Sequence, residues 1–277
     1  METVLSEERF IDVDGAALRV RRAGEGPAIV LVHGWALDLD MWRMQIELLS
    51  QWYRVIAFDR RGFGHSTGEP GIEQDVLDMD RLLARFDIEH AAVVGMSQGA
   101  RVALRWALKH PERATCLVLD APPAEGMSQP PGGEEIPIDE YRERARREGI
   151  DAFRRLWLQH PFMQLHTRVA SAHQLLREIA ARYPAQDLLM EERPALSLLA
   201  ERDLQRLPVP TLILSGELDS QQRRSIARHL TQTLPDARLK TVAGAGHLAS
   251  LDDPMAYSQA VHDFYSSQPA VAAGAVT

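Results

Sequence analysis

The feature that most limits the fold of this chain is a series of short apolar runs separated by longer amphipathic stretches. The runs have the length of buried strands and cover residues 28–32, 54–58, 91–94, 115–119, 210–215 and, more weakly, 237–242. The stretches between them have helical spacing and cover residues 40–51, 73–86, 98–110, 221–233 and 254–266. Strands that are apolar on both faces and alternate with helices are typical of a parallel sheet covered on both sides. The sequence therefore predicts an α/β fold with a mostly parallel central sheet.

Two segments depart from this alternation. Residues 10–13 and 18–20 flank the turn dipeptide Asp14-Gly15, which predicts a hairpin that adds antiparallel strands at one edge of the sheet. From Ala121 to about Leu207 no strand-like run occurs, and apolar residues recur at helical spacing. We therefore expect a core formed by residues 1–121 and 207–266, a helical cap inserted at 122–206, and a disordered tail at 267–277.

Composition excludes several classes of partner. The net charge of -8 and the pI near 5.7 argue against nucleic acid and anionic membranes as partners. The N-terminus is acidic, and no stretch approaches the roughly 20 apolar residues of a membrane span, so we expect a cytoplasmic protein. One cysteine excludes an internal disulfide, and the chain has no His-Glu-x-x-His motif. The glycines of Arg61 to Gly68 are spaced wrongly for a dinucleotide loop, so we expect neither a metal nor a cofactor.

A serine between two glycines follows one of the predicted buried strands. Residues 91–94 lead into Gly95-Met96-Ser97-Gln98-Gly99, and a helical stretch begins there. This is a G-x-S-x-G pattern in the strand–turn–helix context that gives it meaning. The turn must be tight and its backbone strained, so a side chain two residues before or after the serine would collide with neighbouring backbone. The pattern predicts Ser97 as a nucleophile; a plain small-residue turn is the alternative.

His247 is the candidate base. It follows the predicted strand 237–242 in Gly244-Ala245-Gly246-His247, a flexible loop that can bring an imidazole over the sheet edge. The other histidines lie in contexts without such a signature; His33, at the end of strand 28–32, is expected to brace its loop.

Asp219 is the candidate acid because it follows the predicted strand 210–215 at the same edge. The chain order Ser97, Asp219, His247 matches the Ser…Asp/Glu…His order of one large hydrolase fold. Aspartate also commonly caps helices, and a helix is predicted to start near Ser220. Glu217 is the nearest competitor for the acid, and Asp120, at the end of the strand before the cap, is the alternative.

Two backbone N–H groups are expected to stabilise a developing oxyanion. Gln98 follows the nucleophile and begins a helix, whose first N–H groups have no partner inside the helix. Trp35 follows the strand 28–32 in His33-Gly34-Trp35, where Gly34 lets the backbone turn close to the nucleophile.

Together these residues resemble the α/β-hydrolase superfamily, and within it bacterial carboxylesterases, enol-lactonases and haloperoxidase-like esterases. The resemblance covers nearly the whole chain outside the cap and tail. Its marks are His33-Gly34-Trp35, the loop Asp59 to Ser66, Gly95 to Gly99, the turn Gly216 to Asp219, and Gly246-His247 leading to Asp253-Pro254. The resemblance implies that Asp59 to Ser66 is a structural loop near the site. Gln98 is a departure, because many relatives carry Met, Leu or Trp there.

The expected activity is two-step acyl transfer on a small carboxylic ester or lactone, by a serine carboxylesterase that acts as a monomer or homodimer. A serine nucleophile argues against dehalogenase and epoxide-hydrolase chemistry, which the resemblance assigns to an aspartate. Hydrolysis of a C–C bond in a β-diketone-like substrate is the alternative, and a ligand receptor with a vestigial triad is a third. Candidates for an apolar substrate pocket, each of which could equally belong to the core, are Met96, Phe153, Trp157 and Phe162.

Overall fold

An eight-stranded sheet runs through the computed structural model, which describes residues 6–127, 136–191, 196 and 199–268. The strand order is β1-β2-β4-β3-β5-β6-β7-β8. The first two strands form the predicted antiparallel hairpin, β2 runs antiparallel to β4, and all other neighbours are parallel. The strands are β1 (Glu7–Val13), β2 (Ala16–Ala23), β3 (Ala28–Val32), β4 (Arg54–Phe58), β5 (Ala91–Met96), β6 (Ala114–Asp120), β7 (Thr211–Gly216) and β8 (Ala237–Val242).

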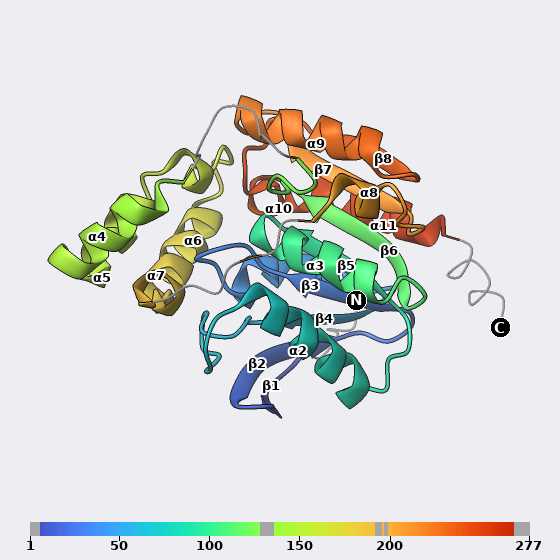
Figure 1. Cartoon of the computed structure of the whole chain (residues 1–277), viewed down its shortest axis with the longest axis horizontal. Coiled ribbons are helices and arrows are strands. Elements are labelled where there is room, and N and C mark those ends of the chain that lie inside the picture. Colours follow the sequence, from blue (N-terminus) through green and yellow to red (C-terminus); the bar gives the residue numbers. More distant parts are fainter. Residues whose placement is uncertain (1–5, 128–135, 192–195, 197–198, 269–277) are drawn as a thin grey trace.

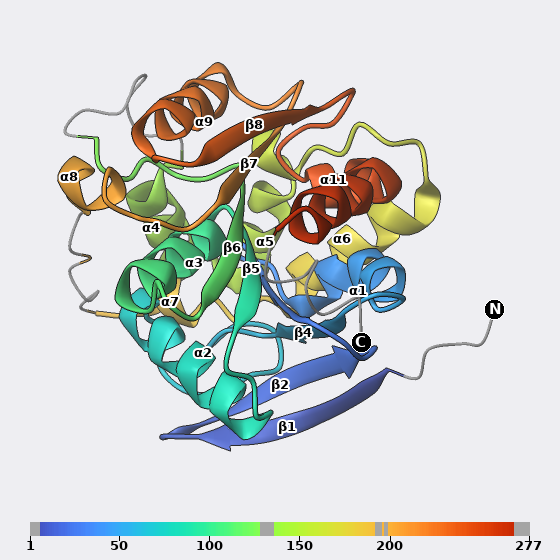
Figure 2. The same ribbon diagram turned by 90° about the vertical axis from the view of Figure 1, so that its right-hand side faces the viewer.

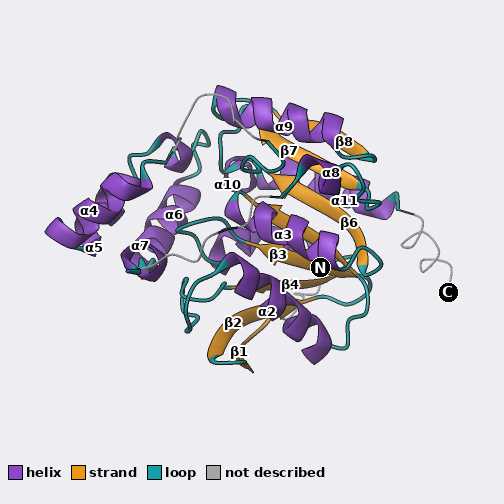
Figure 3. Ribbon diagram, in the orientation of Figure 1, coloured by secondary structure: helices purple, strands orange, loops and turns teal. Residues whose placement is uncertain are grey.

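Helices cover both faces of this sheet, as Figure 2 and the secondary-structure colours of Figure 3 show. On one face lie η1 (Leu39–Trp42), α1 (Arg43–Leu49), α10 (Ala249–Asp252) and α11 (Pro254–Ser266). On the other lie α2 (Ile72–Arg85), α3 (Gln98–Lys109) and α9 (Gln221–Thr233). Because alternate strand residues point to opposite faces of the sheet, the apolar strands contribute side chains to two separate hydrophobic core clusters. The predicted mostly parallel, doubly covered sheet is confirmed.

The cap region lies between β6 and β7. Its helices α4 to α7 gather beyond one end of the sheet (Figure 1). The last helix of this region, α8, instead packs with the core, since Leu204 joins the cluster of α3 and α9. The helices are α4 (Ile138–Glu148), α5 (Ile150–Trp157), η2 (Pro161–Met163), α6 (Ala170–Arg182), α7 (Gln186–Leu189) and α8 (Glu201–Leu204).

The end of the chain differs in part from the predicted tail at 267–277. Helix α11 extends to Ser266, and the buried amide of Gln268 donates a hydrogen bond of 2.7 Å to the Phe264 carbonyl. Residues 269–277 lie outside the described residues. Within the described part of the chain, no helix has the length and apolar character required to cross a bilayer.

Candidate active site

Ser97 occupies a strained turn between β5 and α3. Its φ of 49° and ψ of -113° lie in a region that non-glycine residues rarely adopt. The two flanking glycines make the turn possible: a Cβ on Gly95 would lie 2.3 Å from the Gly99 carbonyl oxygen, and one on Gly99 would lie 2.2 Å from that of Val32. The sequence therefore folds here into the sharp strand-to-helix turn that its G-x-S-x-G pattern predicts.

Asp219 and His247 meet at the same edge of the sheet. The turn after β7 carries Asp219 and the loop after β8 carries His247, whose Nδ1 lies 3.0 and 3.2 Å from the two carboxylate oxygens. Burial raises the pKa of Asp219, but the charge and hydrogen bond of His247 and the N–H of Ser220 outweigh it, so the pKa lies below the usual range. An ionised carboxylate that accepts from Nδ1–H leaves Nε2 as the basic nitrogen of the ring.

The competitors of Asp219 lie elsewhere. Glu217 accepts a hydrogen bond of 2.8 Å from the Gly244 N–H and so ties the turn after β7 to the loop after β8. Asp120 is fully buried at the end of β6; burial, together with the charge of Asp219, raises the pKa of its carboxyl well above the usual range. The structure therefore brings Asp219, and not Asp120 or Glu217, to the His247 ring.

Ser97 and His247 line the same small cavity, of about 20 Å³. Among the described residues, no hydrogen bond joins the Ser97 hydroxyl to the His247 ring, and such contacts often form only when substrate is bound. The rest of the lining is apolar and comprises Trp35, Leu37, Met96, Ile136, Trp157, Phe162, Met163 and Leu248.

Of the four predicted pocket residues, three line this small cavity: Met96, Trp157 and Phe162. Phe153 lines neither this cavity nor the larger cleft beside it. It is fully buried among the rings of Trp35, Tyr141 and Tyr183, where it joins the cap to the core. Helical spacing could place Phe153 on an inward face, but could not distinguish a cavity wall from a packed interior.

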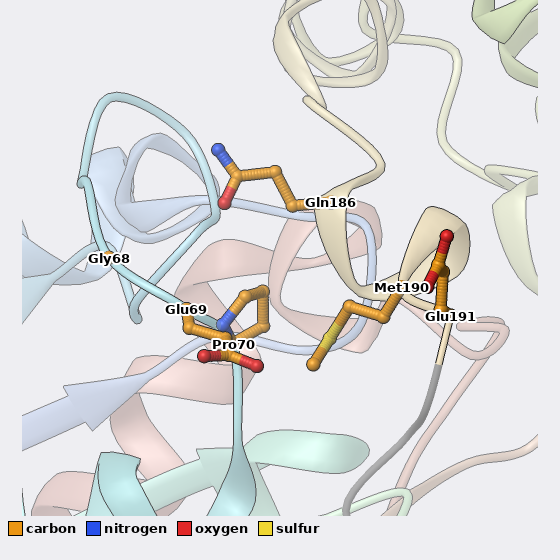
Figure 4. Close-up of a pocket in the computed structure, with 6 residues that line it drawn as sticks. All are labelled: Gly68, Glu69, Pro70, Gln186, Met190 and Glu191. Atoms are coloured by element: carbon orange, nitrogen blue, oxygen red, sulfur yellow. The ribbon is translucent and has the colours of Figure 1, made fainter.

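A larger cleft of about 730 Å³ also reaches Ser97. Trp35, Gln98 and Arg60 line it on the core side, and Ile138 and Met190 line it on the cap side. A shallow hollow of about 820 Å³ shares Glu69, Pro70 and Met190 with this cleft and contains none of the predicted catalytic residues. Figure 4 shows how Gln186 and Met190 of the cap face Glu69 and Pro70 of the core there.

A buried arginine connects the two segments that carry the predicted oxyanion donors. Gln98 is the first residue of α3, and the Trp35 N–H has no hydrogen-bond partner among the described residues. Arg60 links their segments, because its Nη2 donates to the Gly34 carbonyl at 3.1 Å and to the Gln98 side-chain oxygen at 2.6 Å. Its Nη1 pairs with buried Asp75 at 2.9 Å. We call this group of contacts the oxyanion side.

The same group includes His33, whose predicted bracing position is observed. Its Nε2 accepts from the Arg60 N–H at 2.9 Å, and its Nδ1 lies 2.8 Å from the Gly34 carbonyl oxygen. Burial, together with the charge of Arg60, lowers the pKa of His33 well below the usual range. The ring is therefore neutral. Burial also raises the pKa of Asp75 to about 6, despite its pairing with Arg60.

Sequence reasoning missed two side chains near the site. Arg60 was predicted only as part of the structural loop Asp59 to Ser66. The polar side chain of Gln98, where many relatives carry an apolar residue, was a signal that a polar partner such as Arg60 lies nearby. Asp252 was not singled out, yet its carboxylate accepts hydrogen bonds from the His247 loop and from the cap. Its role depends on where the cap docks, which no local pattern around residue 252 encodes.

The arrangement brings together the groups that nucleophilic chemistry requires. It combines a buried serine on a strained turn, an imidazole oriented by an ionised carboxylate, and the helix-start N–H of Gln98 directly after the serine. Within the described ranges, no group of three or more His, Cys, Asp or Glu side chains is arranged to hold a metal ion. Fold and site together define the class of α/β hydrolases.

Comparison with known proteins supports this class. Residues 27–254 match the alpha/beta hydrolase fold family, so the chain belongs to that family. It is 28% identical to the pimeloyl-[acyl-carrier protein] methyl ester esterase of Aeromonas hydrophila over 90% of this chain and 99% of the relative. It is 30% identical to a putative non-heme chloroperoxidase of Synechocystis over 81% of this chain and 86% of the relative.

Among solved structures, the chain resembles a thermophilic esterase from Thermogutta terrifontis. The TM-score is 0.76 at 27% identity, and the match covers 93% of this chain and 97% of that one. The predicted resemblance to esterases and haloperoxidase-like proteins of the α/β-hydrolase superfamily is thus confirmed.

Proposed function

We propose that the protein hydrolyses carboxylic esters through an acyl-enzyme on Ser97. The observation that carries the proposal is the buried Asp219–His247 pair, which lies at the same cavity as the strained Ser97 turn. His247 Nε2 takes the Ser97 proton as Oγ attacks the ester carbonyl carbon. The carbonyl oxygen becomes an oxyanion that accepts from the Trp35 and Gln98 N–H groups, each worth on the order of 3 kcal/mol in such sites.

The second half of the cycle uses the same groups. His247 returns its proton to the leaving alkoxide oxygen as the C–O bond of the ester breaks, which releases the alcohol and leaves the acyl group on Ser97. Water then gives a proton to His247 and attacks the acyl carbon, and His247 returns the proton to Ser97 as the acid leaves. Asp219 stays ionised and orients the ring throughout.

The two cavities suggest which part of the substrate goes where. The leaving oxygen must lie within hydrogen-bond reach of His247, and that ring lines the cavity of about 20 Å³. A space of roughly 10–15 Å³ holds one water, so this cavity takes a group the size of a methyl. The cleft of about 730 Å³, lined by Gln98, is left for the acyl group. A small alcohol fits a relative named as a methyl ester esterase, and a lactone fits less well because its leaving oxygen stays tethered to the acyl chain.

The test is a panel of esters that varies the acyl chain and the alcohol separately. We expect hydrolysis of methyl and ethyl esters, a decline with bulkier alcohols, and tolerance of larger acyl groups. Ser97→Ala should lower kcat by at least about 10⁴-fold, and a fluorophosphonate probe should label the unmodified protein at Ser97 alone.

Each competing function has its own outcome in this panel. Turnover of a vinylogous diketone without ester turnover would indicate C–C bond hydrolysis. An unlabelled Ser97 would indicate a binding protein with a vestigial triad. Selectivity for acetyl esters of bulky alcohols would reverse the assignment of the two cavities while leaving ester hydrolysis intact.

A further inference from the structure

His247, the proposed general base, is covered by a segment of the cap. This segment comprises residues 160–167, and we call it the docking segment. It runs between α5 and α6 and includes η2. Phe162 in η2 stacks directly on the imidazole of His247, with ring centroids 3.9 Å apart and planes inclined by 16°. Its own N–H donates to Nδ1 of His160 at 3.1 Å, which fixes the start of η2. The guanidinium of Arg223 also lies 5.0 Å from the Phe162 ring centroid. Phe162 is therefore buried and fixed in place, and its ring packs against the imidazole of His247.

Asp252 joins the docking segment to the backbone of the loop after β8, which carries His247 and which we call the base loop. One of its carboxylate oxygens accepts from the N–H groups of His166 and Thr167 at 2.6 and 3.0 Å. The other accepts from the Gly246 N–H, next to His247, at 2.7 Å. A Cβ on Gly246 would lie 2.6 Å from the His166 ring, so the two segments approach as closely as a glycine allows. A single carboxylate thus joins cap and base loop.

These contacts restrain a degree of freedom that the triad leaves open. Asp219 holds Nδ1 of His247, but a hydrogen bond at one atom does not fix the tilt of the ring plane. The loop that carries His247 contains Gly244, whose φ is 67°, and Gly246, so its backbone has little intrinsic stiffness. The flat face of Phe162 fixes the plane, and Asp252 fixes the loop beneath it. Nε2 must point at Ser97 in one half-reaction and at water in the other, so the ring plane matters in both.

We propose that the docking segment positions the general base: Phe162 and Asp252 hold His247 in its reactive orientation only while the cap is seated on the core. This inference rests on the proposed function, because it assigns a role within that reaction. Both residues are positioning residues that act through His247. The cap thereby contributes to catalysis itself as well as to the walls of the substrate site.

The experiment compares matched variants in burst kinetics with p-nitrophenyl esters, whose activated leaving group favours acylation although it exceeds the cavity of about 20 Å³. Phe162→Leu fills the space without a planar face, and Phe162→Tyr restores the ring. Asp252→Asn removes the charge and one acceptor oxygen, while Asp253→Asn changes the neighbouring aspartate, which caps α11 through the Ala256 N–H and has no hydrogen bond or ion pair to the described residues of the cap. The readout is the deacylation rate constant, since p-nitrophenol has already left and the size of the alcohol cavity no longer matters.

We expect Phe162→Leu and Asp252→Asn each to slow deacylation about 10- to 100-fold, with KM within about 3-fold of the unmodified enzyme. Phe162→Tyr should recover most of the rate, and Asp253→Asn should leave it unchanged. The double variant should lose less than the product of the single losses, because both act on one ring. Active-site titration with a fluorophosphonate corrects for misfolded protein.

Normal deacylation in both Phe162→Leu and Asp252→Asn would overturn the inference, and an effect on alcohol selectivity alone would reduce Phe162 to a cavity wall. If Phe162→Leu fails to fold, the Asp252→Asn and Asp253→Asn pair decides by itself. Failure of the proposed function looks different: the unmodified enzyme would then hydrolyse no ester, whatever the variants do.

Discussion

The two sides of the candidate site differ in how directly the cap contacts their functional groups. On the oxyanion side, Arg60 bonds to Gly34 and Gln98 and pairs with Asp75, and all of these lie in the sheet, its loops or α2 and α3. On the base side, His247 is held by Asp219 from the core and by Phe162 from the cap. The contacts of Arg60 lie within the core, and the cap meets this side through the Trp35 side chain, which donates to Asp187 at 2.6 Å and packs against three cap rings. On the base side, by contrast, a cap ring stacks on the imidazole of His247 itself.

This difference suggests a division of labour. Oxyanion donors gain most from being fixed before the substrate arrives, because reorganising dipoles during the reaction costs free energy. A base that depends on cap seating can instead be assembled after the substrate has entered, in the manner of lids that complete a site on closure. The cap is also tied to the core away from His247, since Arg182 of α6 pairs with Asp38 and Asp40 at 2.9 and 2.8 Å. The cap is therefore held on the core by these ion pairs as well as by its contacts with His247 and its loop.

The largest expected effect comes from breaking the base side within the core. Asp219→Asn keeps the shape of the side chain but removes the charge that orients the His247 tautomer, so kcat should fall by about 10⁴-fold. Steady-state kinetics at several pH values would measure it. The loss should exceed those of the docking-segment variants, because a wrong tautomer removes the base while a tilted ring only misdirects it. A smaller loss for Asp219→Asn than for Phe162→Leu would reverse the comparison.

Breaking the oxyanion side should have an intermediate effect. Arg60→Lys keeps a positive charge opposite Asp75, but an ammonium cannot reach Gly34 and Gln98 in the fixed geometry of a guanidinium. We expect kcat to fall about 10- to 100-fold with little change in KM, because misplaced donors weaken transition-state binding.

Arg113→Lys is the matched control for Arg60→Lys. Arg113 is a half-buried arginine that pairs with Asp80 at 3.0 Å directly before β6, at the opposite end of the parallel strands from Ser97. It should cost stability in urea unfolding but leave kcat of the folded enzyme unchanged. Equal losses of kcat in both variants would mean that Arg60 matters only for folding.

These two sides also differ in how much of them the sequence predicts. Strand-end placement and chain order predict Ser97, Asp219 and His247 as neighbours, because the carboxyl ends of parallel strands meet at one edge. The structure brings Asp219 to His247 and places Ser97 at the same cavity. Arg60 and Asp252 escape this reasoning, since all their partners except Gly246 are 15 to 86 positions away and are chosen by tertiary packing. Local patterns encode turns and faces; they do not encode which distant backbone a carboxylate will meet.

The smallest expected effect on activity belongs to Asp120→Asn, which tests whether the second buried acid next to the site takes part. Burial raises the pKa of Asp120 well above its ordinary value of 3.8, which favours the protonated carboxyl, and an amide has the same shape as that form. We expect kcat within about 3-fold of the unmodified enzyme.

The raised pKa of Asp120 determines the direction in which the free energy of unfolding changes with pH. A raised native pKa means that the native state holds a proton that the unfolded chain has released above 3.8. The stability that protonated Asp120 contributes to the unmodified protein is therefore fully present below pH 3.8. It is lost as pH rises toward the pKa of Asp120 in the native state. Asp120→Asn lacks this loss, so its advantage should grow as pH rises above 3.8, by at most about 1.4 kcal/mol per pH unit. Urea unfolding at a series of pH values above 3.8 measures the difference. An advantage that shrank with rising pH would mean that Asp120 is ionised in the native state, and Asp120 would then compete with Asp219 for His247.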